Sequence, residues 1–271
     1  MTEQDTHHLE SLQFSPELMP VLFVGHGSPM NAIEDNAFSH NWRELGRRLP
    51  APEAIVCISA HWLTRGTAVT AMPQPRTIHD FWGFPEALNT YRYPAPGDPA
   101  LARSVAGLIT RTEVRQDEEW GLDHGTWIVL TNMFPDAEIP VLQLSIDPRQ
   151  PAQFHYALGE ELKNLRKRGV LLVGSGNIVH NLGLIDISAG HGYDWAIAFD
   201  AAIAERLVQH DQQGILDYEA LGRMAELSVP TNDHYLPLLY VAGASSPQDR
   251  IAFFSEQIVY GSVSMRCVLL Y

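Results

Sequence analysis

Short apolar runs alternate with amphipathic helical segments along most of the chain. The apolar runs are rich in Val, Ile and Leu and are bounded by turn residues, which is typical of strands buried on both faces of a sheet. They lie at residues 21–26, 54–61, 140–146 and 169–176. Apolar side chains at helical spacing lie in residues 38–49, 101–108, 154–165 and 197–208. This alternation predicts an α/β fold with a mostly parallel central sheet covered by helices on both faces.

Three further segments depart from this simple alternation. Residues 235–243 predict a buried helix despite Pro237, and residues 257–270 predict one or two closing strands. Residues 72–99 are irregular, rich in Pro and aromatic side chains, and too long for a simple connection. A segment of this kind is either a lid or wall of a binding site or a packed excursion over the sheet edge.

The length of 271 residues fits one large domain, because a single hydrophobic core can still grow to this size. No repeat or flexible linker divides the chain. We expect a polar N-terminal extension over residues 1–18 and a single domain over residues 19–271.

The composition excludes two classes of partner. A net charge of -14 argues against nucleic acid, which needs clustered Lys and Arg. No run reaches the roughly 20 apolar residues of a membrane span, and the polar, acidic first ten residues do not resemble a signal peptide. We therefore expect a cytoplasmic protein without membrane partners. Cys57 and Cys267 lie in apolar runs, which indicates packing rather than a disulfide.

Histidine stands out at the ends of the predicted elements. Six of the twelve histidines lie in polar or helix-surface contexts, where we expect exposure to solvent: His7, His8, His40, His155, His191 and His210. His26 and His61 instead close two buried strands, at the carboxyl edge where open α/β sheets bind their ligands. This edge is the predicted position of the active site.

Four further histidines lie in predicted loops. His124 stands beside Asp123, which could orient its imidazole, and the flanking glycines would let backbone approach a ligand. His180 follows a strand, His234 precedes the apolar helix, and His79 belongs to the irregular segment. Each alone would be an ordinary hydrogen-bonded histidine, but several at loop positions beside strand ends are harder to explain without a shared ligand.

Imidazoles gathered at one rim are suitable ligands for zinc, iron, copper or nickel. A catalytic metal needs about three protein ligands and an open position, with ionisable groups nearby to move protons. The Gly- and Ser-containing segments lack the spacing of a nucleophile elbow or a dinucleotide fingerprint. On residues alone, a zinc-dependent hydrolase and a non-catalytic metal-binding protein stay open as alternatives.

Seven short motifs then point to a family. In chain order they are GHGSPM at 25–30, SAHW at 59–62, HDF at 79–81, YPAPG at 93–97, DHG at 123–125, GNIVHN at 176–181 and HYLPL at 234–238. Together they resemble the class III extradiol ring-cleaving dioxygenases, which are LigB-like, and within them the 4,5-DOPA extradiol dioxygenase branch. The resemblance extends from Met19 to the C-terminus, and it implies that residues 19–271 form one catalytic domain.

The resemblance implies an oxidoreductase that uses non-haem Fe(II) and O2 to open a catechol ring beside its two hydroxyls. For L-DOPA the product would be 4,5-seco-DOPA, an open-ring semialdehyde. The implied metal ligands are His26, His61 and His234. The implied catalytic residues are His180, as acid and base, and His124, which would contact substrate or O2. The implied substrate contacts are His79, Phe81 and Trp82, with Phe84 beside them.

The resemblance leaves several points open. Other members complete two histidines with a carboxylate, whereas this branch offers a third imidazole. Asp233 could replace His234 as third ligand, but it would point elsewhere if His234 faces the metal, so His234 is preferred. His180 could also bind the metal. Three imidazoles suit zinc as well, so Zn(II) can occupy the site in purified protein. The physiological catechol and the oligomeric state, with a homo-oligomer as one option, are not determined by the residues.

Overall fold

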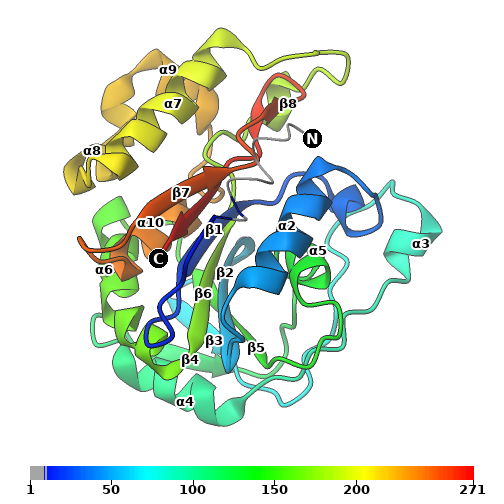
Figure 1. Ribbon diagram of the computed structural model, residues 1–271, viewed down its shortest axis with the longest axis vertical. Coiled ribbons are helices and arrows are strands. Elements are labelled where there is room, and N and C mark those ends of the chain that lie inside the picture. Colours follow the sequence, from blue (N-terminus) through cyan, green and yellow to red (C-terminus); the bar gives the residue numbers. More distant parts are fainter. Residues whose placement is uncertain (1–8, 10) are drawn as a thin grey trace.

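The structure, a computed structural model, describes residue 9 and residues 11–271. Across this part of the chain, an eight-stranded sheet forms the centre of the molecule (Figure 1). In spatial order its strands are β4 (Val114–Asp117), β3 (Thr67–Thr70), β5 (Val141–Ile146), β2 (Ala54–Leu63), β6 (Val170–Gly176), β1 (Val21–Gly25), β10 (Cys267–Leu270) and β7 (Ile251–Phe254). The central strands β5, β2, β6 and β1 run parallel, whereas β10, β7 and β3 make antiparallel pairs. The predicted mostly parallel sheet is confirmed.

Helices cover both faces of the sheet, as predicted (Figure 1). One face carries α2 (Ala37–Arg48) and α5 (His124–Met133), and the other carries α4 (Pro99–Leu108), α6 (Ala152–Leu162) and α10 (Leu236–Ala244). Successive side chains of a strand point to opposite faces. Val21 and Phe23 of β1 therefore join the core beneath α6 and α10, while Leu22 and Val24 join the core beneath α2 and α5.

The remaining elements lie outside these layers. α7 (Asp194–Val208) packs against α8 (Gln212–Leu216) and α9 (Arg223–Ser228), at the upper left of Figure 1. The short helical turns are η1 (Pro29–Ala32), α3 (Glu86–Asn89), η2 (Lys163–Arg168), η3 (Leu182–Leu184) and η4 (Tyr218–Leu221). β8 (Ile258–Val259) and β9 (Val263–Ser264) form a separate hairpin. Over the described residues, no helix combines the length and apolarity needed to cross a bilayer.

Side-chain caps determine where two of the covering helices begin. The Asn36 side chain accepts hydrogen bonds from the backbone of Phe38 and Ser39, and Ser39 Oγ accepts one from Asn36 N–H, so that α2 starts with a capping box. The Asp98 side chain caps α4 by accepting hydrogen bonds from the backbone of Ala100 and Leu101, and Pro99 occupies the first helical position, where its missing N–H is not needed.

Two details differ from the sequence expectations. His155 is buried inside α6 rather than exposed, with Nδ1 3.1 Å from the Tyr240 hydroxyl, and burial lowers its pKa to about 4. The sequence of α6 does not reveal the burial of His155, because the helix that covers it, α10, is distant in sequence. Residues 257–270 form three short strands rather than one or two.

The N-terminal extension is tied to the domain where it is described. Leu9 and Leu12 are buried in the same core as α2 and α5, and the Phe14 ring packs edge-on against Tyr271. Residues 1–8 and 10 lie outside the described residues, and the boundary at residue 19 stays a prediction. Cys57 and Cys267 are both buried and free, as expected.

The contact between α6 and α10 depends on two glycines. A Cβ added to Gly159 of α6 would overlap the Tyr240 carbonyl oxygen, and one added to Gly243 of α10 would overlap that of Tyr156. The two helices therefore approach each other backbone to backbone. This close approach positions α10, whose N-terminal end follows His234 directly.

We expect Gly159→Ala to lower the free energy of unfolding by about 1–3 kcal/mol, because the new methyl forces the two helices apart. Gly107→Ala is the matched control. An added Cβ at Gly107, in exposed α4 backbone, meets nothing, and we expect a gain of about 0.5–1 kcal/mol from helix propensity. Urea denaturation measures both, and equal effects of the two substitutions would contradict the packing argument.

Candidate metal centre

Five histidines from separate segments line one cavity of about 390 Å³ at the carboxyl edge of the sheet. They are His26, His61, His124, His180 and His234. His26 follows β1, His61 lies near the end of β2, and His124 is the first residue of α5. His180 follows β6, and His234 precedes α10. Because β2, β6 and β1 are parallel neighbours, their carboxyl ends meet at one edge.

The imidazole rings are in mutual contact. His26 Nε2 lies 3.1 Å from His61 Nε2. The His234 ring centroid is 5.4 Å from that of His26 and 5.0 Å from that of His61. The ring centroids of His124 and His61 are 3.9 Å apart. The His180 ring stacks on that of His234, with centroids 3.4 Å apart and an interplanar angle of 9°. Five of the six histidines that the sequence singled out at strand ends and loops are thus brought together.

A hydrogen-bond chain determines the tautomer of His26. Ser175 Oγ donates to the Gly125 carbonyl at 2.5 Å, so its own proton is used there. Ser175 Oγ must then accept from His26 Nδ1, which lies 3.1 Å away. The proton therefore lies on Nδ1, and Nε2 presents a lone pair toward His61. A hydrogen bond of this kind to the outer nitrogen is typical of metal-binding histidines.

His234 shows the same arrangement with a carboxylate. Its Nδ1 contacts Asp233 Oδ2, while its Nε2 is buried without a hydrogen-bond partner among the described residues. Burial raises the pKa of Asp233, but the hydrogen bond and charge of His234, together with hydrogen bonds from Thr231 and the backbone, outweigh burial and hold the pKa well below its ordinary value. Asp233 is therefore ionised beside His234, and a buried, unpartnered Nε2 calls for a ligand.

Asp80 is the acidic residue that the sequence reading missed. Asp80 Oδ1 lies 2.9 Å from His124 Nδ1 and also accepts from the His124 backbone N–H at 3.0 Å, while Oδ2 lies 3.7 Å from His61 Nδ1. Burial raises the pKa of Asp80, but the contacts with His124 together lower it by more, so the pKa lies below its ordinary value. Asp80 thus lies against the His124 imidazole and near that of His61, whose Nδ1 is beyond hydrogen-bond distance. Its position within the HDF motif was the available signal.

Asp123, which we expected to orient an imidazole, has a different role. Its carboxylate is fully buried and accepts from Ser59 Oγ at 2.7 Å, from Gln143 Nε2 at 2.6 Å and from the backbone of Thr126 at 3.2 Å. It therefore caps α5 and connects that helix to β2 and β5. Burial, together with the nearby charge of Asp80, raises the pKa of Asp123.

These side chains fit a divalent metal ion. Two nitrogens bound to one ion at about 2.0–2.1 Å lie roughly 3.0–3.4 Å apart, and the His26 and His61 Nε2 atoms lie 3.1 Å apart. Burial, followed by the neighbouring imidazoles, lowers the pKa of both rings well below the ordinary value. Neutral rings have the free lone pairs that a metal requires.

Two groups of ligand atoms within 4.8 Å of one another are found among the described residues. One is His26, His61 and His124, and the other is His180, Asp233 and His234. The two groups adjoin, because the His234 ring also lies against His26 and His61. The implied ligands His26, His61 and His234 thus lie side by side, with His124 and His180 next to them.

The cavity walls are only partly those expected. Phe81 and Phe84 line the cavity with Leu182, Ile185 and Tyr260. His79 and Trp82 do not line it: His79 Nε2 is hydrogen-bonded to the Tyr91 carbonyl at 2.9 Å, and Trp82 is 86% exposed. The sequence of this irregular segment does not predict which side chains point into the cavity, because the segment has no helical or strand periodicity.

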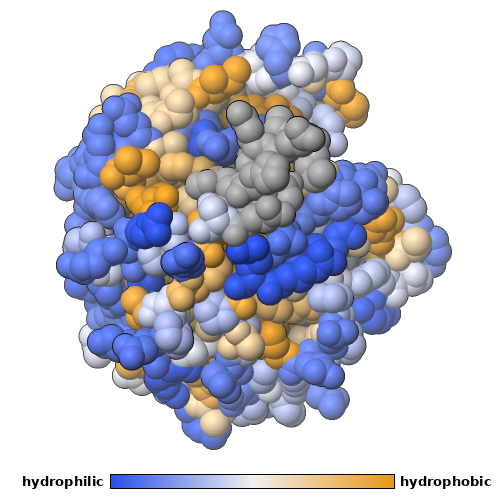
Figure 2. Space-filling view, in the orientation of Figure 1, coloured by the Kyte–Doolittle hydropathy of each residue, from blue (hydrophilic) through white to orange (hydrophobic). Residues whose placement is uncertain are grey.

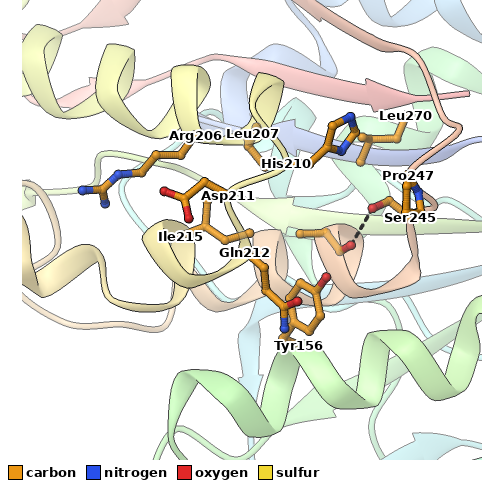
Figure 3. Close-up of a pocket in the computed structure, with 11 residues that line it drawn as sticks. Tyr156, Arg206, Leu207, His210, Asp211, Gln212, Ile215, Ser245, Pro247 and Leu270 are labelled. Carbon is orange, nitrogen blue, oxygen red and sulfur yellow. Dashed lines mark hydrogen bonds between the residues drawn. The ribbon is translucent and has the colours of Figure 1, made fainter.

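A second cavity, of about 160 Å³, lies between α6, α7 and α10 (Figure 3). His210 and Asp211 line it but belong to neither group of metal-ligand atoms. Arg206 points away from the other side chains, and its Nη1 donates to the Gly214 carbonyl. The chemistry of the molecule therefore concentrates at the histidine cavity.

Comparison with known proteins agrees with this site. Residues 20–264 match the family described as the catalytic LigB subunit of aromatic ring-opening dioxygenase. The chain belongs to the LigB family. It is an extradiol ring-opening dioxygenase, which weighs against the hydrolase and non-catalytic alternatives.

Relatives within the LigB family cover nearly the whole chain. The 4,5-DOPA dioxygenase extradiol of Escherichia coli K12 is 48% identical over 96% of this chain and 97% of its own length. A 4,5-DOPA dioxygenase extradiol of Beta vulgaris is 37% identical over 84% of this chain and 87% of its own. A solved structure of an uncharacterized Escherichia coli K12 protein is 44% identical, with a TM-score of 0.82 over 93% of this chain and 100% of that one.

We expect Ser175→Ala to weaken metal binding by roughly 10- to 100-fold, because His26 loses the acceptor that orients its ring. Titration of the metal-free protein with zinc against a competing chelator measures the change in Kd. Ser188→Ala, on an exposed loop, is the control and should leave the Kd unchanged. An unaltered affinity in Ser175→Ala would show that His26 is not oriented for a metal.

Proposed function

We propose that this enzyme opens the ring of a catechol such as L-DOPA with O2, giving an open-ring semialdehyde of the 4,5-seco-DOPA type. The observation that carries the proposal is the convergence of five imidazoles, two of them with Nε2 atoms 3.1 Å apart, in one cavity of a LigB-family chain. The names of the relatives support L-DOPA as a representative substrate. A cytoplasmic location stays a prediction from sequence, and the oligomeric state stays open, with a homo-oligomer as one option.

The proposed metal ligands are His26, His61 and His234. We assign Asp233 to orienting His234 rather than to replacing it as a metal ligand. Its carboxylate contacts His234 Nδ1, which leaves the buried Nε2 free. Non-haem Fe(II) is the proposed working metal, and when bound it would supply the open coordination positions and the redox chemistry that O2 requires. Three imidazoles also suit Zn(II), which can replace iron in purified protein.

His180 and His124 are the proposed proton-transfer residues. Burial and the neighbouring His234 lower the pKa of His180 to about 3, so the ring is neutral at pH 7. Its place in the cavity beside His234, rather than this pKa, supports the assignment to proton transfer. Asp80 Oδ1 lies 2.9 Å from His124 Nδ1, and a proton on that nitrogen would leave Nε2 for contact with substrate. Phe81 and Phe84 provide an apolar wall that excludes water from the aromatic ring.

Iron-loaded protein, prepared without oxygen, should consume one O2 for each catechol after exposure to air, with a coloured ring-opened product. An oxygen electrode and absorbance spectra measure both. Zinc-loaded protein is the control and should consume none, because zinc has no redox chemistry. A protein that binds iron and a catechol yet takes up no oxygen would overturn the proposed function.

His180→Gln should lower kcat by about 10²–10⁴-fold while metal content stays at the level of the unsubstituted enzyme, because the side chain is assigned to proton transfer rather than to metal binding. His26→Gln should instead lose the metal. Metal analysis beside oxygen uptake separates the two roles. Loss of metal in His180→Gln would show that His180 is a metal ligand. Unchanged turnover would show that His180 takes no part in the reaction.

A further inference from the structure

A tight turn between β8 and β9 carries Tyr260 to the histidine cavity. Val259 pairs with Val263 across this hairpin, and the Ser262 N–H donates to the Val259 carbonyl at 3.2 Å. The two central residues of the turn, Tyr260 and Gly261, have φ of 52° and 75°. Positive φ at both central positions is the requirement of a type I′ turn, for which Asn-Gly is a favoured pair.

The backbone of this turn disfavours tyrosine at position 260. Left-handed backbone is uncommon outside glycine and asparagine, and a bulky side chain there is an outlier that costs free energy. Four described residues other than glycine have a positive φ, and Tyr260 is the one of them that lines the histidine cavity. Backbone strain and contact with the cavity thus coincide at one residue, which indicates a role for its ring.

Hydrogen bonds on both sides of His180 hold the turn in place. The Ser264 N–H donates to the Val179 carbonyl at 2.9 Å. The Asn181 N–H donates to the Ser262 carbonyl at 3.1 Å, and Ser262 Oγ donates to the Asn181 carbonyl at 2.8 Å. The position of the turn is therefore fixed relative to the proposed proton-transfer residue.

Tyr260 lies toward the solvent side of the cavity. Its exposed fraction is 38%, against 2% for His26 and 6% for His234. Its carbonyl accepts from the Asp186 N–H at 3.1 Å, which connects the turn to the segment that carries Ile185, another residue of the cavity wall.

The proposed function determines which part of a substrate reaches Tyr260. The two hydroxyls of a catechol lie among the imidazoles, because these offer the proton acceptors and metal ligands. The far side of the ring, with the substituent of a 4-substituted catechol, then lies toward the solvent side of the cavity. The carbon chain of the substituent can pack on an aromatic ring there, while polar groups beyond it stay hydrated.

We propose that Tyr260 is a specificity-determining residue, whose ring packs against the substituent of a 4-substituted catechol such as L-DOPA. The proposal rests on the proposed function and adds the side chain that distinguishes a substituted from an unsubstituted ring. Burial of the substituent against Tyr260 offsets the free energy that the left-handed backbone costs at this position.

Tyr260→Asn removes the ring and introduces a residue that the turn favours. We expect kcat/KM of the iron-loaded enzyme for L-DOPA to fall by about tenfold, because an aromatic packing contact is lost. The value for unsubstituted catechol should stay within about twofold, because that substrate has no substituent to pack. Unchanged values for both substrates, or an equal loss for both, would overturn the proposal.

Tyr260→Phe is the matched control, because it keeps both the ring and a bulky residue at positive φ. It should keep the ratio of kcat/KM for L-DOPA and catechol within about twofold of the original. A loss equal to that of Tyr260→Asn would overturn the role of the ring. The urea midpoint of Tyr260→Asn should equal or exceed that of the unsubstituted enzyme. A lower midpoint with equal losses for both substrates would assign Tyr260 to the fold instead.

Binding separates the role of Tyr260 from the proposed function. Isothermal titration of iron-loaded protein under argon should show a Kd for L-DOPA about tenfold higher in Tyr260→Asn, with the Kd for catechol unchanged. This selective loss in a protein that opens no ring would refute the proposed function and keep the role of Tyr260. Ring opening by all three proteins with equal Kd and kcat/KM would keep the function and overturn the role of Tyr260.

Discussion

Parallel pairing of β2, β6 and β1 is the constraint on which the site depends. The register places Ser59 opposite Ser175 and Gly25 opposite Gly176, so that the ends of three strands lie level at one edge. A shift by one residue would turn every side chain to the opposite face. Ser175 would then lose His26, and the ring would lose its defined tautomer.

Two glycines allow the other segments to approach this edge. A Cβ at Gly176 would overlap the His234 carbonyl oxygen, and one at Gly125 would lie 2.6 Å from Ser59 Oγ. The absent side chains let the His234 turn and the start of α5 lie directly on the strand ends. Metal ligands need this proximity, because nitrogen–metal distances leave little tolerance. Gly125 thus allows close contact between protein segments.

Electrostatics divide the cavity into regions with different functions. Asp80 and Asp233 lie behind the imidazoles, against the outer nitrogens of His124 and His234, and the proposed function assigns the inner nitrogens to a metal and a catechol. The rest of the cavity wall, its apolar rim, includes Phe81, Phe84, Leu182, Ile185 and Tyr260. The face of the molecule in Figure 2 is largely polar, with apolar side chains in separate patches. An apolar rim around a nitrogen-rich interior favours a flat aromatic ring with two polar atoms at one end.

The sequence alone determined the fold class and the composition of the site. The spacing of its apolar residues predicted the strands and helices. The five histidines of the cavity could be recognised because they lie at strand ends and in loops, and the carboxyl edge of a parallel sheet follows from the direction of the chain: His26, His61, His124, His180 and His234. Only the tertiary structure decided the partners. Asp80 rather than Asp123 orients an imidazole, Trp82 turns to solvent, and His155 is covered by α10. These outcomes depend on contacts between segments far apart along the chain and on an irregular segment without a repeating period, and neither leaves a local pattern in the sequence.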